Sequence, residues 1–175
     1  MSDTATLFQN AETTVEEVVV MLSHAQQVTH SQRTTYYRSA LFLSASITEA
    51  ILYELIRRHL DNNPELCNVK TSTKYKKIHT LPRVVRSDKQ LVVCEKETHP
   101  FRLGGQTGFK EMNEFALKAE LITRSIFNRL ENVRKRRNEI HLHALSSSRR
   151  SFRKYDIEKT ANVTHLLVRR LLNDF

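Results

Sequence analysis

Apolar residues recur at intervals of three or four along most of this chain, which is the spacing of an amphipathic helix. Residues 1–12 are predicted to be a loose start. Thr13 and Glu16 stand just before the apolar run VVVML, where a hydroxyl and a carboxylate three residues apart can form a capping box. A first helix is therefore predicted from this point to about Thr29.

A second helix is predicted from about Thr34 to His59. Asp61-Asn62-Asn63 and then Pro64 should stop it, because proline lacks an amide hydrogen and restricts the residue before it. One face of this helix carries the residues expected in the core: Tyr37, Leu41, Ser44, Ile47, Ile51 and Leu55. Small residues between Ser39 and Ala50 would let a neighbouring helix approach closely.

Two further helices are predicted in the second half of the chain. The first should begin near Thr107 or Gly108, and its stripe should continue without a break to Arg137 and Ile140. Its apolar stripe is Phe109, Met112, Ala116, Ala119, Ile122, Ile126, Leu130 and Val133. After a polar linker at residues 146–148, Asp156 can cap the second of these helices. Its expected inner face is Ile157, Ala161, Thr164, Leu167 and Leu171.

Residues 65–108 lack a clear period and are predicted to be an irregular insertion, with a short strand possible at Gln90–Cys94. The predicted fold class is therefore all-α, a bundle of four to five helices with an irregular insertion at about 65–108. The length of 175 residues fits a single domain spanning 1–175.

The charge is unevenly distributed. The chain carries 28 Lys and Arg against 19 Asp and Glu, a formal net charge of +9. Residues 70–89 and 131–154 are each net +6, so the rest of the chain is net −3. Local positive fields of this kind favour a polyanionic or acidic partner, with a soluble basic surface as the plainer explanation.

Neither export nor a membrane span is expected from the sequence. The first residues lack the basic-then-apolar order of a secretory signal, and no apolar run approaches the ~18 residues of a spanning helix. We therefore expect a cytoplasmic protein without membrane contact. Cys67 and Cys94 are expected to be reduced, since they form no CxxC motif and nothing marks export.

The end of the third predicted helix carries candidate chemistry, in the segment ENVRKRRNEIHLHAL. Arg137 takes a position of the buried stripe where an apolar residue is expected, and His141 follows one turn later on the same face. A buried arginine is costly unless the helix end faces a cleft or another subunit. The alternative is that the arginines form a solvated face and the histidines lie at a frayed helix end.

The run RRNEIHLH, residues 136–143, resembles the signature of HEPN domains. That signature is an Arg, usually followed by Asn, Asp or His, and then a His after four to six residues. The segment SASITEAILYEL, with Glu49, is similar to the second helix of that family, and the helix predicted over Tyr155–Asn173 is similar to its closing helix. The resemblance covers most of the chain outside 65–108 and implies a helical RNase fold.

Three registers of the motif are compatible with the sequence. Arg137-Asn138 and His143 have five residues between Arg and His, Arg136 and His141 have four, and Arg137 and His141 have three. The first register is favoured because it keeps Asn138 in its expected place, and His141 is the second choice. Glu49 is predicted either to pair with Arg137 and fix its side chain or to be exposed beside Glu54.

The resemblance implies metal-independent cleavage of RNA without a cofactor. His143 or His141 would take the proton of a ribose 2′-hydroxyl, Arg137 would stabilise the charge on the phosphate, and Asn138 would orient one of them. It also implies a homodimer in which two motifs meet, in a toxin or defence effector with an antitoxin or nucleotidyltransferase as a possible partner. The surrounding basic residues are predicted to bind RNA: Arg134, Arg136, Arg149, Arg150, Lys74, Lys76 and Lys77.

Two other functions are considered. The same basic residues could hold nucleic acid or an acidic antitoxin without catalysis. A metal site formed by His141 and His143 with Cys94 or His165 is disfavoured, because alternating histidines suit a strand better than a helix.

Overall fold

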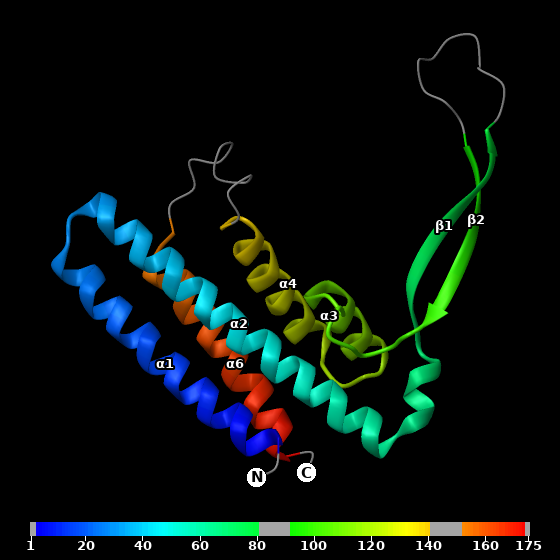
Figure 1. Ribbon diagram of the computed structural model, residues 1–175, viewed down its shortest axis with the longest axis horizontal. Coiled ribbons are helices and arrows are strands. Elements are labelled where there is room, and N and C mark those ends of the chain that lie inside the picture. Colours follow the sequence, from blue (N-terminus) through cyan, green and yellow to red (C-terminus); the bar gives the residue numbers. More distant parts are fainter. Residues whose placement is uncertain (1–2, 81–91, 141–151, 174–175) are drawn as a thin grey trace, which may run out of the picture.

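The computed structural model describes residues 3–80, 92–140 and 152–173 (Figure 1). Within them, five α-helices pack together, which confirms the predicted all-α bundle. The elements in chain order are α1 (Asp3–Gln27), α2 (His30–Asn62), the 3-10 helix η1 (Pro64–Asn68), β1 (Lys70–Thr80), β2 (Val92–Pro100), α3 (Phe109–Lys118), α4 (Arg124–Asn138) and α6 (Lys154–Asn173).

Helix α2 is the centre of the bundle, and α1, α3, α4 and α6 all pack against it. The predicted core face is confirmed for Leu41, Ser44, Ile47, Ile51 and Leu55, which are all buried, while Tyr37 is only partly buried. Helix α2 ends at Asn62, as predicted from the proline two residues later. By length and composition its span Gln32–Asn62 would also qualify as a membrane-crossing helix, but 56% of the apolar window lies buried inside the bundle.

The capping box predicted at Thr13 and Glu16 is wrong, because α1 begins ten residues earlier, at Asp3. The Thr13 hydroxyl instead donates to a backbone carbonyl one turn back in the same helix. A box-like arrangement occurs at the start of α2. There the backbone amide and the hydroxyl of Thr29 donate to Oε1 of Gln32, at 3.4 and 2.9 Å.

The single long helix predicted after the insertion is wrong: it is two helices, α3 and α4, joined by a sharp turn. Glu120 has the left-handed φ of 60° in this turn. Leu121 and Ile122 follow it and are both buried, at 5% and 3% exposed. Thr123 then caps α4, its hydroxyl oxygen accepting from the Ile126 amide. The turn buries two consecutive apolar side chains, which a straight surface helix would point in different directions.

The irregular insertion is only partly confirmed, because much of it forms an antiparallel hairpin of β1 and β2. The register runs from Lys70 opposite Pro100 to Thr80 opposite Val92. Figure 1 shows the hairpin projecting away from the helices. Phe101 follows β2 and anchors its base, stacked on Phe115 of α3 with ring centroids 3.9 Å apart. The hairpin lacks the alternating apolar pattern of a packed strand, since it extends outward and does not lie on the core.

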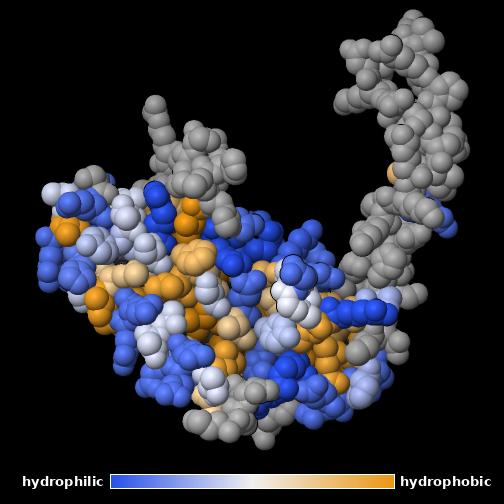
Figure 2. All heavy atoms as spheres, in the orientation of Figure 1, coloured by the Kyte–Doolittle hydropathy of each residue, from blue (hydrophilic) through white to orange (hydrophobic). Residues whose placement is uncertain are grey.

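Two groups of buried residues form the core. The larger joins α2, α3, α4 and α6, and the smaller joins α1 and α2 to the start of α6 around Phe152. On α6 the predicted Ile157, Leu167 and Leu171 are buried, but Ala161 is exposed and Thr160 is buried in its place. Figure 2 shows a largely hydrophilic visible face, interrupted by hydrophobic groups near its middle.

Candidate functional site

Helix α4 ends in a run of basic residues whose side chains face different helices. Each residue of an α-helix is rotated by about 100° from the one before it. Arg136 therefore contacts α6, whereas Arg137, the next residue, contacts α2. The candidate site lies at this end of α4, where neighbouring side chains contact different helices.

Arg137 forms an ion pair with Glu49 from the middle of α2, with Nη1 and Oε2 2.7 Å apart. Of the two arrangements predicted for Glu49, the ion pair is the one observed. The Arg137 guanidinium carbon also lies 5.8 Å from the centroid of the Phe42 ring. About a quarter of each charged side chain is exposed, at 26% for Arg137 and 24% for Glu49. The inward-facing arginine is thus accommodated by a carboxylate and an aromatic ring.

The remaining donors of Arg137 are not all used. Its Nε is buried and has no hydrogen-bond partner among the described residues. A guanidinium has five N–H donors in a fixed plane, so one carboxylate oxygen leaves several of them available. Arg137 is therefore oriented by Glu49 and has donors that this carboxylate does not use.

Arg136 has a much more complete set of partners. Its Nε and Nη2 donate to the two carboxylate oxygens of Asp156 on α6, at 3.1 and 2.7 Å, and its Nη1 donates to Glu139 at 2.6 Å. Its guanidinium carbon lies 5.4 Å from the centroid of the buried Phe152 ring. Burial lowers the pKa of Arg136, but the hydrogen bonds to Asp156 and Glu139 outweigh it and raise the pKa overall. Arg136 joins α4 to α6, and little of it is left for RNA.

Asp156 was predicted to cap α6, but the helix begins two residues earlier, at Lys154, so Asp156 lies within its first turn. Its Oδ2 accepts from the backbone amide of Arg153, at 3.0 Å, while also accepting from Arg136. The carboxylate lies in the first turn of the helix, where an anion is stabilised by the unpaired amides.

Arg134 is also paired, on the side of α4 that faces α3. Its Nε and Nη2 donate to the Glu131 carboxylate, which in turn accepts from Nδ2 of the fully buried Asn113. Burial raises the pKa of Glu131, but the hydrogen bonds from Arg134 and Asn113 and the nearby positive charges lower it overall. The hydrogen bond to Glu131 raises the pKa of Arg134.

Asn138 is the last residue of α4 and is exposed. The two candidate histidines, His141 and His143, lie outside the described residues, and so do Arg149 and Arg150. The predicted register of the motif is therefore left open. Of the predicted site, the structure describes the ion pair of Arg137 and Glu49 but neither histidine.

The three lysines predicted to bind RNA from the insertion lie on β1. The register sets Lys74 opposite Glu97 and Lys76 opposite Glu95, while Lys77 is opposite Cys94. Because β1 extends away from the bundle, these positions are not brought together with Arg137 (Figure 1). The two basic segments are thus separate in space, and Cys94 is a free, exposed cysteine.

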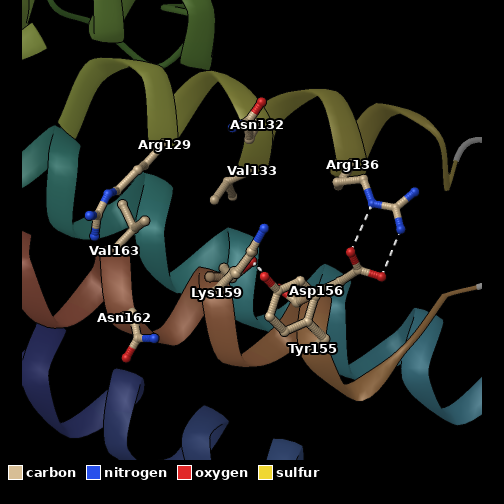
Figure 3. A pocket seen from close by; sticks show the side chains of 10 residues that line it. Arg129, Asn132, Val133, Arg136, Tyr155, Asp156, Lys159, Asn162 and Val163 are labelled. Atoms are coloured by element: carbon tan, nitrogen blue, oxygen red, sulfur yellow. Dashed lines mark hydrogen bonds and ion pairs between the residues drawn. The ribbon is translucent and has the colours of Figure 1, made fainter. Parts of the chain in front are cut away.

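A cleft of about 430 Å³ between α4 and α6 was not predicted from the sequence. Figure 3 shows Val133, Tyr155 and Lys159 between the two helices, with the Arg136–Asp156 pair at one end and Arg129 beside Val163 toward the other. It is lined by Arg129, Asn132, Val133, Arg136, Tyr155, Asp156, Lys159, Thr160, Asn162 and Val163. The sequence signal for the α4 side was Arg129, Asn132 and Arg136 at helical spacing beside the buried Val133.

Within the described ranges, no three His, Cys, Asp or Glu side chains are grouped so that they could hold a metal ion. The chain matches no protein-family model, no curated protein and no solved structure.

Proposed function

We propose that this chain is a metal-independent endoribonuclease of the HEPN type, with an Arg/His composite site at a homodimer interface. One observation carries the proposal: Arg137 from the motif and Glu49 from the middle of α2 form an ion pair 2.7 Å long. These two residues belong to the two separate segments on which the resemblance rests. A chance motif would give no reason for the two segments to meet.

The chemistry follows from what these side chains can do. A histidine near neutral pKa, His143 or His141, takes the proton from a ribose 2′-hydroxyl, and the oxygen attacks the adjacent phosphorus. The products are a 2′,3′-cyclic phosphate and a 5′-hydroxyl. Arg137 stabilises the extra negative charge on the phosphate, because it stays protonated and keeps free donors beside Glu49. Asn138 orients the substrate or the histidine with a neutral hydrogen bond.

A dimer supplies the second proton-transfer group. One motif contributes one histidine to the site, whereas the reaction needs both an acid and a base. A symmetric dimer that brings two α4 ends together would provide both from identical chains. The activity is that of a cytoplasmic toxin or antiphage effector, with an antitoxin or a nucleotidyltransferase as its regulatory partner.

The test is incubation of the purified protein with single-stranded RNA in EDTA. We expect cleavage to persist and the products to carry 2′,3′-cyclic phosphate ends. Arg137→Ala should lower the rate about 10²–10³-fold, and His143→Ala or His141→Ala about 10²–10⁴-fold. Arg169→Ala, which removes an exposed charge on α6, is the matched control and should retain the rate. Cleavage that needs a divalent metal, or that survives Arg137→Ala, would contradict the proposal.

A second function is favoured by the pairing of the arginines. Arg134, Arg136 and Arg137 each already contact a carboxylate, which reduces the positive charge available to a phosphate. A non-catalytic module that binds nucleic acid or an acidic antitoxin needs no free guanidinium at the motif. It predicts binding that weakens steeply between about 50 and 200 mM salt with no product formed.

A further inference from the structure

The cleft between α4 and α6 has the form of a small-ligand site. The two helices are antiparallel here, since Arg136 near the end of α4 meets Asp156 at the start of α6 (Figure 3). Val133 and Val163 supply its apolar surface and are 4% and 3% exposed. Its volume of about 430 Å³ lies within the range of about 300–1,000 Å³ typical of ligand pockets.

The charged side chains of the cleft are of two kinds. Arg136 and Asp156 neutralise each other at one end. Arg129 and Lys159 have no carboxylate partner in the described part of the chain, and both are exposed. Their two positive charges therefore face the cleft without compensation, which favours an anionic ligand.

The rest of the lining is aromatic and amide. Tyr155 is 60% exposed, and the ammonium of Lys159 lies 4.3 Å from the centroid of its ring. Asn132 on α4 and Asn162 on α6 lie at the edges of the cleft, and Figure 3 shows both amides turned outward, away from the space between the two helices. An exposed ring stacks well on a planar base.

We infer that this cleft binds a nucleotide unit, with the phosphate on Arg129 and Lys159 and the base on Tyr155. The site is distinct from Arg137, which faces α2 on another side of α4, so the inference does not depend on the proposed cleavage. The same chemistry serves a free nucleotide or one nucleotide within an RNA strand. A binding experiment separates these two sources.

The experiment titrates the full chain, by calorimetry, with each of the four nucleoside 5′-monophosphates, with inorganic phosphate and with short single-stranded RNAs. We expect saturable binding of at least one nucleotide. Arg129→Ala and Lys159→Ala should each weaken it about tenfold or more, because each removes a charge-assisted hydrogen bond. Tyr155→Ala should weaken it about tenfold, and Tyr155→Phe, which keeps the ring, about twofold at most. Arg169→Ala, the matched loss of an exposed charge on α6, should leave the affinity unchanged.

The affinities show whether the cleft binds a nucleotide and whether that nucleotide is free or part of an RNA strand. Binding of monophosphates with affinities close to those of the RNAs supports a free nucleotide as the ligand. RNA binding at least about tenfold tighter, reduced by the same substitutions, supports a nucleotide within a strand. Loss of nucleotide binding in the three alanine variants while Arg137→Ala still binds supports the cleft whether or not the protein cleaves RNA. No nucleotide or RNA binding, equal affinity in all variants, or inorganic phosphate binding to the unchanged protein as tightly as the nucleotides would each overturn it.

Discussion

The two sides of the last turn of α4 use an arginine in different ways. Toward α6, Arg136 has three donor atoms engaged by Asp156 and Glu139, and a buried aromatic ring lies beside it. Toward α2, Arg137 has one short contact with Glu49 and a buried Nε without a partner among the described residues. From the sequence alone the two residues cannot be told apart, because they carry the same charge and belong to the same predicted helix.

The difference separates a structural arginine from one that can take part in binding. A guanidinium whose donors are filled by a carboxylate from another helix fixes the distance between those helices. A guanidinium held by one oxygen keeps its direction and still has donors to offer. The following predictions test this contrast, from the largest expected change in stability to the smallest.

Arg136→Ala should lower the free energy of unfolding by about 2–3 kcal/mol, since it removes the cation that joins α4 to the partly buried Asp156 of α6. Arg137→Ala should lower it by about 1 kcal/mol or less, because its ion pair has a single short contact. Urea denaturation of both variants measures the difference. Arg169→Ala is the control, with an expected change within about 0.5 kcal/mol. Equal losses of unfolding free energy in Arg136→Ala and Arg137→Ala would contradict the view that Arg136 is the structural arginine of the two.

The α2 side can be tested by exchanging charges. Glu49→Arg and Arg137→Glu should each destabilise the fold, and the double variant should recover about 1 kcal/mol relative to the sum of the two. A double-mutant cycle in urea gives this coupling energy. Additive effects would mean that the ion pair contributes nothing to stability in solution.

Glu131 provides a pH-dependent comparison, because Arg134 is held by a carboxylate of its own helix. The pKa of Glu131 is lowered below its ordinary value near 4.5, so its contribution is complete above that value and is lost as pH falls through the lower folded-state pKa. Glu131→Gln should cost about 1 kcal/mol at pH 6–7, and the difference from the unchanged protein should shrink below about pH 4. Thermal unfolding across pH 3–7 measures it. A gap that widens in acid would contradict the assigned direction.

The turn before α4 offers the smallest effect. Glu120 has a φ of 60°, a conformation that costs a residue with a Cβ about 1 kcal/mol relative to glycine. Glu120→Gly should therefore raise the free energy of unfolding by about 0.5–1 kcal/mol, whereas Glu120→Ala should give no gain. Because this turn sets where α4 begins, Arg136 and Arg137 should keep their separate partners in both variants. A loss of stability with glycine would show that the Glu120 side chain matters more than its backbone.

The sequence predicted those features that depend on helical periodicity. The buried face of α2 and its end before Pro64 follow from spacing and local hydrogen bonding. An acidic residue at the start of α6 was also predicted, although Asp156 lies within the first turn and is not the cap residue. The break at Glu120 could not be seen, because it contains neither Gly nor Pro and is favoured only by the burial of Leu121 and Ile122. Of the hairpin, only the possible strand at Gln90–Cys94 was suggested, and it overlaps the start of β2 at Val92. The rest was missed because the hairpin extends away from the core and so shows no apolar alternation.

Only part of the candidate site could be predicted from the sequence, because the rest depends on how the helices pack. The sequence suggested Glu49 as a partner for Arg137, because an acidic residue beside the apolar stripe of a central helix needs an explanation. It could not separate Arg136 from Arg137, since the direction of each side chain depends on where α4 starts and on which helix lies beside it. The cleft with Arg129 and Lys159 was missed because its two walls are distant in the chain.

The hairpin has a consequence for how different parts of the chain exchange amide hydrogens. With only two strands in the described sheet, each strand is an edge, so one of its two rows of backbone groups has no neighbouring strand. Isolated two-stranded ribbons are marginally stable in water, whereas α2 is enclosed on several sides. Deuterium should therefore enter β1 and β2 well before the central residues of α2, and Phe101 should mark the boundary between fast and slow exchange.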